Sequence, residues 1–347
     1  MRRCAPRWIF YTAGGVKEFP FFTFAFQRNQ PPRRQRRMGI PEDVPFYASL
    51  LDRCAAARDL PTLHRAHARL LALGLARHRF LRSKLCASYA RCLRLRDAHL
   101  LLSSAPSAPA FLYNSLIRAH AKLGRHGPAL LLLRHMLSHG PLPDARTLAS
   151  ALRAAAGLAS LRLGRPLHAA SLAAGLAPNP VVANSLVAMY SKCGDLASAR
   201  HVFDRMPRRT LASWTVMIAT CGTHGRAAEA VELFGRMLEE GELPDAAAMT
   251  AVLAACARGG LAEAGRRVFE TMREGRLGDV RPGVEHYTCM VDLLGREGYV
   301  EEAEVLLEEM EQEPDDALWR ALLGACRMHG RLDVAERVAT RVYGKLG

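Results

Sequence analysis

Residues 110–144 read AFLYNSLIRAHAKLGRHGPALLLLRHMLSHGPLPD, and residues 211–245 read LASWTVMIATCGTHGRAAEAVELFGRMLEEGELPD, 101 positions further along the chain. Their landmarks align at this single offset: Tyr113 with Trp214, Ile117 with Ile218, Gly124 with Gly225, Met136 with Met237 and Asp144 with Asp245. The same offset relates His67 to His168, Tyr89 to Tyr190 and Cys92 to Cys193. A fixed period of this kind is typical of an array of stacked units. The recurring His and Cys residues are therefore expected to belong to the scaffold.

Each stretch of about 35 residues contains two segments with apolar residues at helical spacing. In residues 110–144 these are Leu116, Ile117, His120 and Ala121, then Ala129, Leu132, Leu133 and Met136. Gly124 separates the two segments, and Gly140 with Pro143 ends the second. Helix pairs that cannot bury their apolar faces alone must stack. The sequence therefore predicts an all-α fold, a right-handed α-solenoid superhelix of helix-turn-helix repeats.

The landmarks recur after 35, 35 and 31 residues and divide the chain into units. The predicted units are 44–78, 79–109, 110–144, 145–179, 180–210, 211–245, 246–283 and 284–315, followed by 316–347. The unit 246–283 is longer, with an insertion around Arg276–Arg281. Pro166 falls near the start of a second helix and is expected to distort it.

The net charge of +15 suggests a polyanionic partner, and the basic excess lies in the first half of the chain. Residues 38–180 contain nineteen Lys and Arg against six Asp and Glu, whereas residues 181–347 contain twenty against twenty-six. Two long stretches, Ala98–Ile117 and His168–Ser191, contain no Asp, Glu, Lys or Arg. Prolines interrupt both, so neither is expected to form one helix of membrane length. We expect no membrane contact.

Residues 1–38 precede the repeats and contain nine Lys and Arg against Glu18 alone, interleaved with aromatic residues. This composition is typical of an organelle transit peptide. The absence of serine favours the mitochondrion over the chloroplast. A disordered tail, or a true start at Met38, is the alternative.

The nine cysteines contain no CxxC pair, which indicates a reducing compartment and small buried side chains. His64 and His67 have the spacing of metal ligands, but His67 recurs as His168 with the scaffold. We therefore predict no metal site and no cofactor. No nucleophile–base set or phosphate loop is present, so the chain is not expected to be an enzyme.

Several phrases resemble plant pentatricopeptide repeat (PPR) proteins: FLYNSLI from Phe111, NSLVAMYSKCG from Asn184, ARHVFDRMP from Ala199 and SWTVMI from Ser213. The alternating lengths resemble the subclass with P, L and S repeat variants. HYTCMVDLLGR from His286 and LWRALLGACRMHG from Leu318 resemble the closing repeats and the first part of the following E region. The resemblance covers about residues 44–347 and implies that each repeat faces one nucleotide of single-stranded organelle RNA.

The resemblance also implies that the fifth and last residues of P- and S-type units select the base. These pairs are Asn114 with Asp144, Asn184 with Thr210, Thr215 with Asp245, and Thr288 with Asp315. Thr with Asp resembles the guanine-selecting pair, Asn with Asp the uracil-selecting pair, and Asn with Thr a weak pyrimidine pair. Ser83 is followed by Pro109, which has no side-chain donor, so its base stays unassigned. The alternative is that these residues are ordinary helix caps and turn residues.

A second set of residues supports the same face. Arg91, Lys122, Lys192 and Arg296 each follow the base-selecting residue of their unit by eight positions, a spacing that keeps them on roughly the same side of a helix. One cation per repeat suits a phosphate backbone, although Thr223 breaks the series. Phe80, Phe111 and Val181, second in their units, resemble apolar residues that flank each base in the family, and Glu285 departs from that pattern. A solvated charged face is the other interpretation.

Many relatives continue into a zinc deaminase domain with HxE and PCxxC motifs. This sequence has neither, and it stops at Gly347 within what we expect to be a truncated E-type repeat, residues 316–347. The leading hypothesis is a specificity factor for cytidine-to-uridine RNA editing, with the deaminase supplied in trans by a partner protein. An acidic run, consisting of Glu301, Glu302, Glu304, Glu308, Glu309, Glu311 and Glu313, would recruit that partner or would be only a solvated helix face. The alternatives are RNA binding for transcript stability, splicing or translation, a protein-interaction solenoid, and a truncated inactive gene product.

Overall fold

The computed structural model describes residues 11–12, 15–16, 43–103, 108–278, 280–311 and 313–343. Apart from two short strands, β1 (Tyr11–Thr12) and β2 (Gly15–Val16), which pair antiparallel, these residues form helices and their connections. The transit peptide expected at residues 1–38 otherwise lies outside the described residues. The predicted all-α fold is confirmed.

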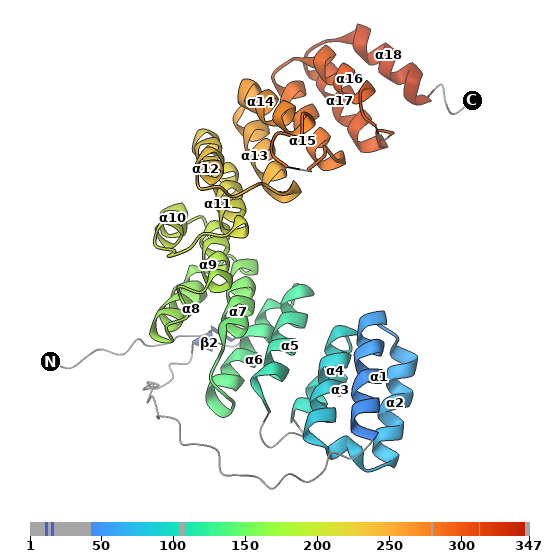
Figure 1. Cartoon of the computed structure of the whole chain (residues 1–347), viewed down its shortest axis with the longest axis vertical. Helices are drawn as coiled ribbons and strands as arrows, with labels where there is room; N and C mark the ends of the chain where they lie inside the picture. The colour runs from blue at the N-terminus through green and yellow to red at the C-terminus, as the bar shows by residue number, and fades with distance from the viewer. Residues whose placement is uncertain are drawn as a thin grey trace, which may run out of the picture. The chain divides into compact units, whose positions relative to one another are not determined.

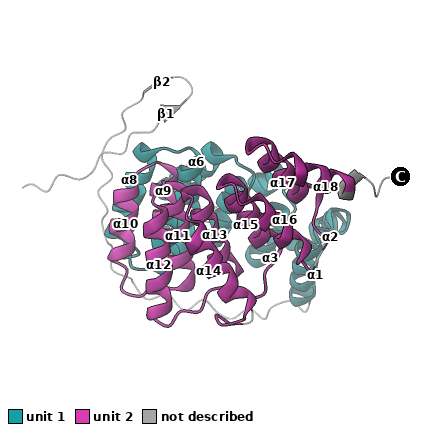
Figure 2. Cartoon of the chain, turned by 90° about the horizontal axis from the view of Figure 1, so that it is seen from above, with its two compact units in different colours: residues 1–185 teal, residues 186–347 magenta. Residues whose placement is uncertain are grey.

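The chain divides into two compact units, residues 1–185 and 186–347 (Figure 2). The first holds α1 (Asp43–Ala57), α2 (Leu60–Ala72), the 3₁₀ helix η1 (Leu75–Arg77), α3 (Arg79–Arg91), α4 (Leu95–Ser103), α5 (Ala110–Lys122), α6 (His126–His139), α7 (Ala145–Gly157) and α8 (Leu161–Ala173). Helix α9 (Pro180–Lys192) contains the division. The second holds α10 (Leu196–Asp204), α11 (Leu211–Thr223), α12 (Ala227–Glu239), α13 (Ala246–Gly259), α14 (Ala262–Arg273), α15 (Val284–Arg296), α16 (Val300–Glu308), α17 (Asp316–Met328) and α18 (Leu332–Tyr343).

The helices alternate between a first and a second helix of each pair, and every pair lies within one of the units cut from the sequence, to within one residue. The second helices differ in length. Those of units 79–109, 180–210 and 284–315, namely α4, α10 and α16, have nine residues each. The other second helices have twelve to fourteen. The alternation of repeat lengths therefore arises mainly in the second helix and the connection after it.

Within each compact unit, every first helix packs against the first helix of the next pair (Figure 1). In residues 1–185 this series is α1, α3, α5 and α7, and in residues 186–347 it is α11, α13, α15 and α17. Leu51, Leu85, Leu116 and Leu152 come from the four first helices of the first unit, and all four are fully buried. Burying one such leucine stabilises the fold by about 1.5–3 kcal/mol relative to leaving it exposed to water. In a stacked array this burial comes from contacts with the neighbouring helix pairs. This stacking is that of an α-solenoid.

Small residues set the spacing between first helices. A Cβ atom added to Gly222 in α11 would lie 2.7 Å from the Cβ of Ala255 in α13, and one added to Gly295 in α15 would lie 2.8 Å from the Cβ of Ala325 in α17. The two contacts occupy the same positions of different units. The first helices therefore approach each other closely because neither side has a larger side chain.

The predicted break between the helices of a pair is found at Gly124 and Gly225, which have φ angles of 68° and 72°. These left-handed conformations favour glycine. The two uncharged stretches are also interrupted as expected, since α4 ends at Ser103 before α5 begins at Ala110, and α8 ends at Ala173 before α9 begins at Pro180. In the part of the chain that the structure describes, no helix combines the length and apolarity needed to cross a bilayer.

Pro166 does not end the helix that contains it. It is the sixth residue of α8, and the α-helix continues through it to Ala173. A proline there removes one backbone donor, whose acceptor would have been the carbonyl of Arg162. The remaining hydrogen bonds and the burial of Leu167 hold the helix together across this position.

Candidate nucleic-acid interface

In four units, the side chain of the last residue caps the first helix of the next unit. Side-chain oxygens of Asp144, Thr210, Asp245 and Asp315 accept hydrogen bonds from backbone amides at the starts of α7, α11, α13 and α17. The donor–acceptor distances are 2.8 Å for Asp144 and Asp245, 2.9 Å for Asp315 and 3.4 Å for Thr210. The capping interpretation of these residues is therefore correct, and it does not exclude a second role, because a carboxylate has further acceptor sites.

The structure brings one predicted pair together directly. The side-chain nitrogen of Asn114 donates to both carboxylate oxygens of Asp144, at 3.0 Å to Oδ1 and 2.9 Å to Oδ2. The hydroxyl of Thr147 in α7 donates to the amide oxygen of Asn114. Asn114 is half-buried and Asp144 is exposed, so the pair lies at the surface of the junction between two repeats.

These contacts change the chemistry of Asp144. Partial burial alone would raise its pKa, but hydrogen bonds from Thr147 and Asn114 to the carboxylate outweigh burial and lower the pKa below its usual value. Asp144 is thus ionised near neutral pH and is an acceptor only. The pair therefore places an ionised carboxylate beside an amide whose nitrogen donates to it and whose oxygen accepts from Thr147.

The other predicted fifth residues with hydroxyl groups are engaged within their own helices. Thr215, Thr288 and Ser83 donate to the backbone carbonyl four residues earlier, at distances of 2.8, 2.7 and 2.9 Å. Such bonds between a hydroxyl and its own helix cost little to break. Thr215 is half-buried and Thr288 exposed, so both hydroxyls can turn towards a ligand.

Asn184 and Thr210 lie on either side of the division between the compact units, and each is described alone. The amide oxygen of Asn184 in α9 is buried, and among the described residues it has no hydrogen-bond partner. Thr210 exchanges hydrogen bonds with Ser213, whose hydroxyl accepts from the Thr210 amide at 3.2 Å.

The predicted cations all occupy the last turn of a first helix and are exposed. Arg91 ends α3, Lys122 ends α5, Lys192 ends α9 and Arg296 ends α15. Cations at this end also stabilise the helix dipole, which gives them a structural role besides any contact with phosphate. Arg296 forms an ion pair with Asp292 at 2.8 Å, so its charge is partly neutralised.

The apolar residues predicted to flank bases are exposed, as that role requires. Phe80 and Phe111 each keep 50% of their surface exposed and Val181 keeps 57%. The Nζ atom of Lys84 lies 5.6 Å from the ring centre of Phe80 and 2.6 Å from a carboxylate oxygen of Asp52. Lys84 was not among the predicted residues, since it lies outside the series that is spaced eight positions from each base-selecting residue.

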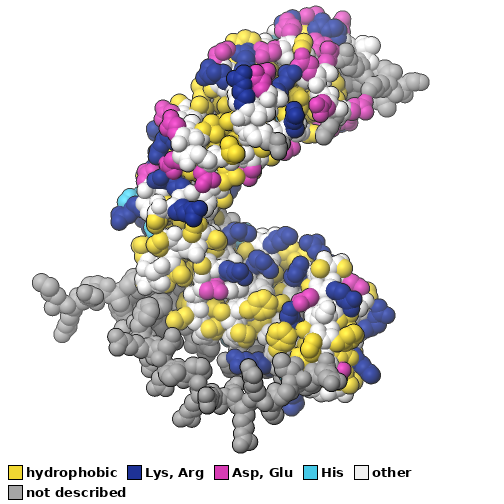
Figure 3. Space-filling model, in the orientation of Figure 1, with side chains coloured by type: hydrophobic (Ala, Val, Ile, Leu, Met, Phe, Trp, Pro, Cys, Tyr) yellow, Lys and Arg dark blue, Asp and Glu magenta, His cyan; other side chains and the backbone are white. Residues whose placement is uncertain are grey.

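Charges are distributed unevenly over the described surface. On the face shown in Figure 3, Asp and Glu side chains gather over α11–α18 and are sparse over α1–α8. The described residues 43–180 have too few carboxylates to neutralise their nineteen basic side chains. The first compact unit therefore presents most of the positive charge.

The acidic run is largely occupied by ion pairs between second helices. Arg266 and Arg273 of α14 bind Glu302 and Glu309, Arg337 of α18 binds the buried Glu304, and Arg331 binds Glu301. The distances for the first three pairs are 2.6, 2.8 and 2.6 Å. These carboxylates link α16 to its neighbours, a role that neither sequence interpretation included.

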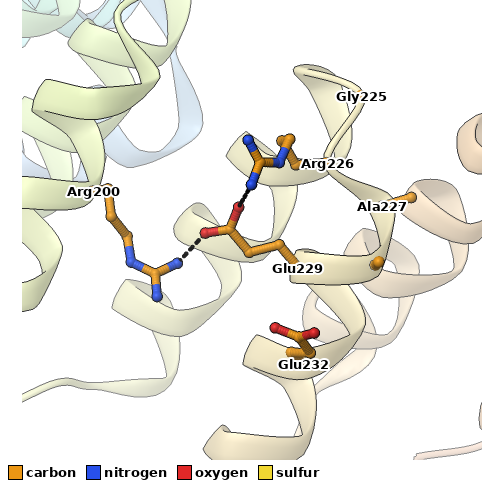
Figure 4. A pocket seen from close by; sticks show the side chains of 7 residues that line it. Arg200, Gly225, Arg226, Ala227, Glu229 and Glu232 are labelled. Carbon is orange, nitrogen blue, oxygen red and sulfur yellow. Dashed lines mark hydrogen bonds and ion pairs between the residues drawn. The ribbon is translucent and has the colours of Figure 1, made fainter.

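A shallow hollow lies where α10 approaches the start of α12. Figure 4 shows Glu229 between Arg200 and Arg226, with an ion pair to each. Glu232 lines the same hollow. The charges at this place join two neighbouring helix pairs and form no nucleophile–base arrangement.

The histidines and cysteines behave as scaffold residues. His67 in α2 shares a hydrogen bond of 3.0 Å with the hydroxyl of Tyr89 in α3, the first helix of the next pair. No group of three His, Cys, Asp or Glu side chains in the described residues is arranged to hold a metal ion. Cys54, Cys86, Cys221, Cys256 and Cys326 are buried, and Cys92, Cys193 and Cys289 are half-buried. Burial raises the pKa of the Cys86 thiol to about 12, so it is unreactive at neutral pH.

Thr147 is the functional candidate that the sequence prediction missed. Its signal was present, because Asp144 and Thr147 have the spacing of a capping box at the start of an apolar helix. The contact with Asn114 of the preceding helix pair could not be inferred from local spacing.

Taken together, the helix pairs and the polar residues at their junctions define a helical-repeat protein in which the junction after unit 110–144 presents a joined polar pair, Asn114 and Asp144, at the surface. Comparison with known proteins identifies the repeat. The family described as PPR repeat matches residues 111–141, 181–211, 212–242 and 247–277, and a second PPR repeat family matches residues 279–311. The chain belongs to the pentatricopeptide repeat proteins.

Similar proteins of Arabidopsis thaliana extend the match over most of the chain. Pentatricopeptide repeat-containing protein CRR2, chloroplastic, is 35% identical over 316 residues, which is 89% of this chain and 48% of that protein. A putative mitochondrial pentatricopeptide repeat-containing protein is 36% identical over 88% of this chain and 49% of its own length. The chain thus spans about half the length of the curated relatives it matches.

Solved structures share the fold. The crystal structure of the pentatricopeptide repeat protein PPR10 in complex with an 18-nt psaJ RNA element matches with a TM-score of 0.67 and 19% identity, over 82% of this chain and 43% of that one. The structure of PPR10 from maize matches with a TM-score of 0.65.

Proposed function

We propose that this chain binds single-stranded RNA in an organelle, with one nucleotide facing each repeat. The observation that carries the proposal is the Asn114–Asp144 pair, in which the fifth and last residues of one repeat meet at the surface of a repeat junction. The bound RNA in a solved relative of the same fold supports this proposal. The mitochondrion is the proposed location and the chloroplast the alternative, since relatives are named for both.

The finer proposal is that the chain specifies sites of cytidine-to-uridine editing, with a deaminase supplied in trans. The nine-residue second helices α4, α10 and α16 support this, because they recur with the short units of the P, L and S pattern. Recruitment of the partner through the acidic run has less support, since Glu301, Glu302, Glu304 and Glu309 already bind arginines. Residues 316–347 are proposed to be an E-type repeat.

The proposed base preferences follow from the pairs. Unit 110–144, with Asn114 and Asp144, selects uracil. Units 211–245 and 284–315, each with Thr and Asp, select guanine, and unit 180–210 weakly selects a pyrimidine. Thr and Asp supply a hydroxyl and a carboxylate, whereas Asn and Asp supply an amide in place of the hydroxyl, so the two kinds of pair present different donors to the same base edge.

Two experiments test these proposals. The purified chain is mixed with pooled single-stranded RNA at low salt, where phosphate contacts are strongest, and retarded migration in a gel is expected. No retardation would favour a protein-interaction solenoid. Organelle transcriptome sequencing of a loss-of-function line is expected to show one or more unedited cytidines. Altered transcript ends or retained introns with editing intact would favour the alternative roles in stability or splicing.

A further inference from the structure

The Asn114–Asp144 pair is held by a third side chain that belongs to the next repeat. Thr147 is the third residue of α7 and is fully buried. Its hydroxyl oxygen lies within hydrogen-bond distance of the amide oxygen of Asn114, at 2.9 Å from Oδ1 of Asp144 and at 3.2 Å from the backbone nitrogen of Asp144. One buried hydroxyl thus contacts both members of the pair.

The proton of this hydroxyl has one best acceptor. The backbone amide of Asp144 donates to the hydroxyl oxygen, and Oδ1 of Asp144 already accepts from the backbone nitrogen of Thr147 and from the side chain of Asn114. The hydroxyl of Thr147 therefore donates to the amide oxygen of Asn114. The distance between these two oxygens is also shorter than the distance from the hydroxyl oxygen to Oδ1 of Asp144. A hydroxyl has a single proton to donate, so this contact fixes its orientation.

The orientation of the Asn114 amide decides what a base can recognise. Turning the amide by half a turn would exchange its donor and its acceptor, and so would exchange the pattern presented to a base edge. In the observed orientation, Nδ2 faces an ionised carboxylate and Oδ1 faces a hydroxyl donor. When a base competes for Asp144, the hydroxyl of Thr147 still holds the amide oxygen, because Thr147 is buried below the pair.

We propose that Thr147 is a positioning residue that sets the base preference of unit 110–144 by holding the amide of Asn114 in one orientation. This inference rests on the proposed function. The corresponding positions behind Asp245 and Asp315 are Ala248 and Leu318, which have no hydroxyl. Base selection by the Asn114–Asp144 pair therefore depends on the next repeat in a way that the Thr–Asp pairs do not share.

The test compares Thr147→Val, which removes the hydroxyl at nearly constant volume, with Thr147→Ser, which keeps it. The RNA position facing unit 110–144 is defined as the one whose base preference is lost in Asn114→Ala. Affinities are then measured for RNAs that differ only at this position, and for RNAs that differ only at the position whose preference changes in Thr215→Asn. Circular dichroism and thermal unfolding check that each variant is folded.

Thr147→Val is expected to reduce base discrimination at the first position roughly fivefold, the value of one neutral hydrogen bond, and to leave the second position unchanged. Thr147→Ser is expected to restore the discrimination. If folded Thr147→Val keeps the discrimination of the unmodified chain, the inference is wrong and the proposed function stands. Equal losses at both positions would also contradict it, since they would indicate a general structural effect. If the unmodified chain binds RNA without preference at any position, the proposed function and this inference are both wrong.

Discussion

The close approach between α11 and α13 predicts opposite effects for one added methyl group at two glycines of the same helix pair. A Cβ atom at Gly222 would lie 2.7 Å from the Cβ of Ala255 and 3.0 Å from a guanidinium nitrogen of Arg258. Arg258 also donates from Nε to the carbonyl oxygen of Gly222 at 3.0 Å, so it cannot move away without losing this bond. At Gly235 in α12, an added Cβ atom would meet nothing within 4 Å.

The magnitudes follow from two competing effects. Alanine in place of a helical glycine stabilises a protein by about 0.5–1 kcal/mol. Overpacking in a close contact costs about 1–3 kcal/mol. Gly235→Ala is therefore expected to raise the free energy of unfolding by about 0.5–1 kcal/mol. Gly222→Ala is expected to lower it by about 1 kcal/mol, the difference between the middle of the overpacking range and the middle of the helix gain.

The assay is urea unfolding followed by circular dichroism, with tryptophan fluorescence as a local probe in a background in which Trp8 and Trp319 are replaced by phenylalanine, so that the signal comes from Trp214 in α11. Trp214 is fully buried and lies in the helix that contains Gly222. If Gly222→Ala and Gly235→Ala shift the urea midpoint in the same direction and by the same amount, the argument that small residues set the helix spacing is wrong.

Three further predictions concern stability, pH and charge. His286→Ala should lower the free energy of unfolding by about 1–3 kcal/mol, because the buried imidazole accepts from the N-cap amide of α15 at 2.9 Å and bonds the carbonyl of Ala246 at 3.0 Å; an unchanged urea midpoint would contradict this. Burial lowers the pKa of His120 to about 4, so an unfolded chain binds its proton more readily and stability should fall as the pH drops from about 6.5 towards 4. Replacing His120 with leucine should flatten that dependence, and a loss of stability with the same slope would count against it. Lys122→Gln should weaken RNA binding for all sequences and reduce the slope of log affinity against log salt by about 1, whereas an unaltered slope would exclude a phosphate contact.

Much of the fold could be predicted from the sequence because the repeat supplies the same information several times. Gly124 and Gly225 mark the same turn in two units, and both adopt the left-handed conformation that their position requires. At Pro166 the local preference of proline against the helix interior does not end the helix. Helix α8 continues through it, and the neighbouring Leu167 is buried.

The candidate site was predictable to the level of residues, but not of contacts. Periodicity places Asn114 and Asp144 at the start of a first helix and at the end of its unit. It does not show that the side chain of Asn114 donates a hydrogen bond to Asp144. Nor does it show that the hydroxyl of Thr215 donates to a carbonyl of its own helix instead. The ion pairs of Glu302 and Glu304 also depend on which second helices lie side by side, and charge counts contain no such information.

The central claim is that the fifth and last residues of the repeats face successive bases of a bound strand. Selection of bound RNA from a random pool by the purified chain, compared with the Thr215→Asn variant, tests it most directly. The account predicts one changed position in the selected sequence, from guanine to uracil, with the other positions retained. Identical selected sequences from the two proteins would contradict it.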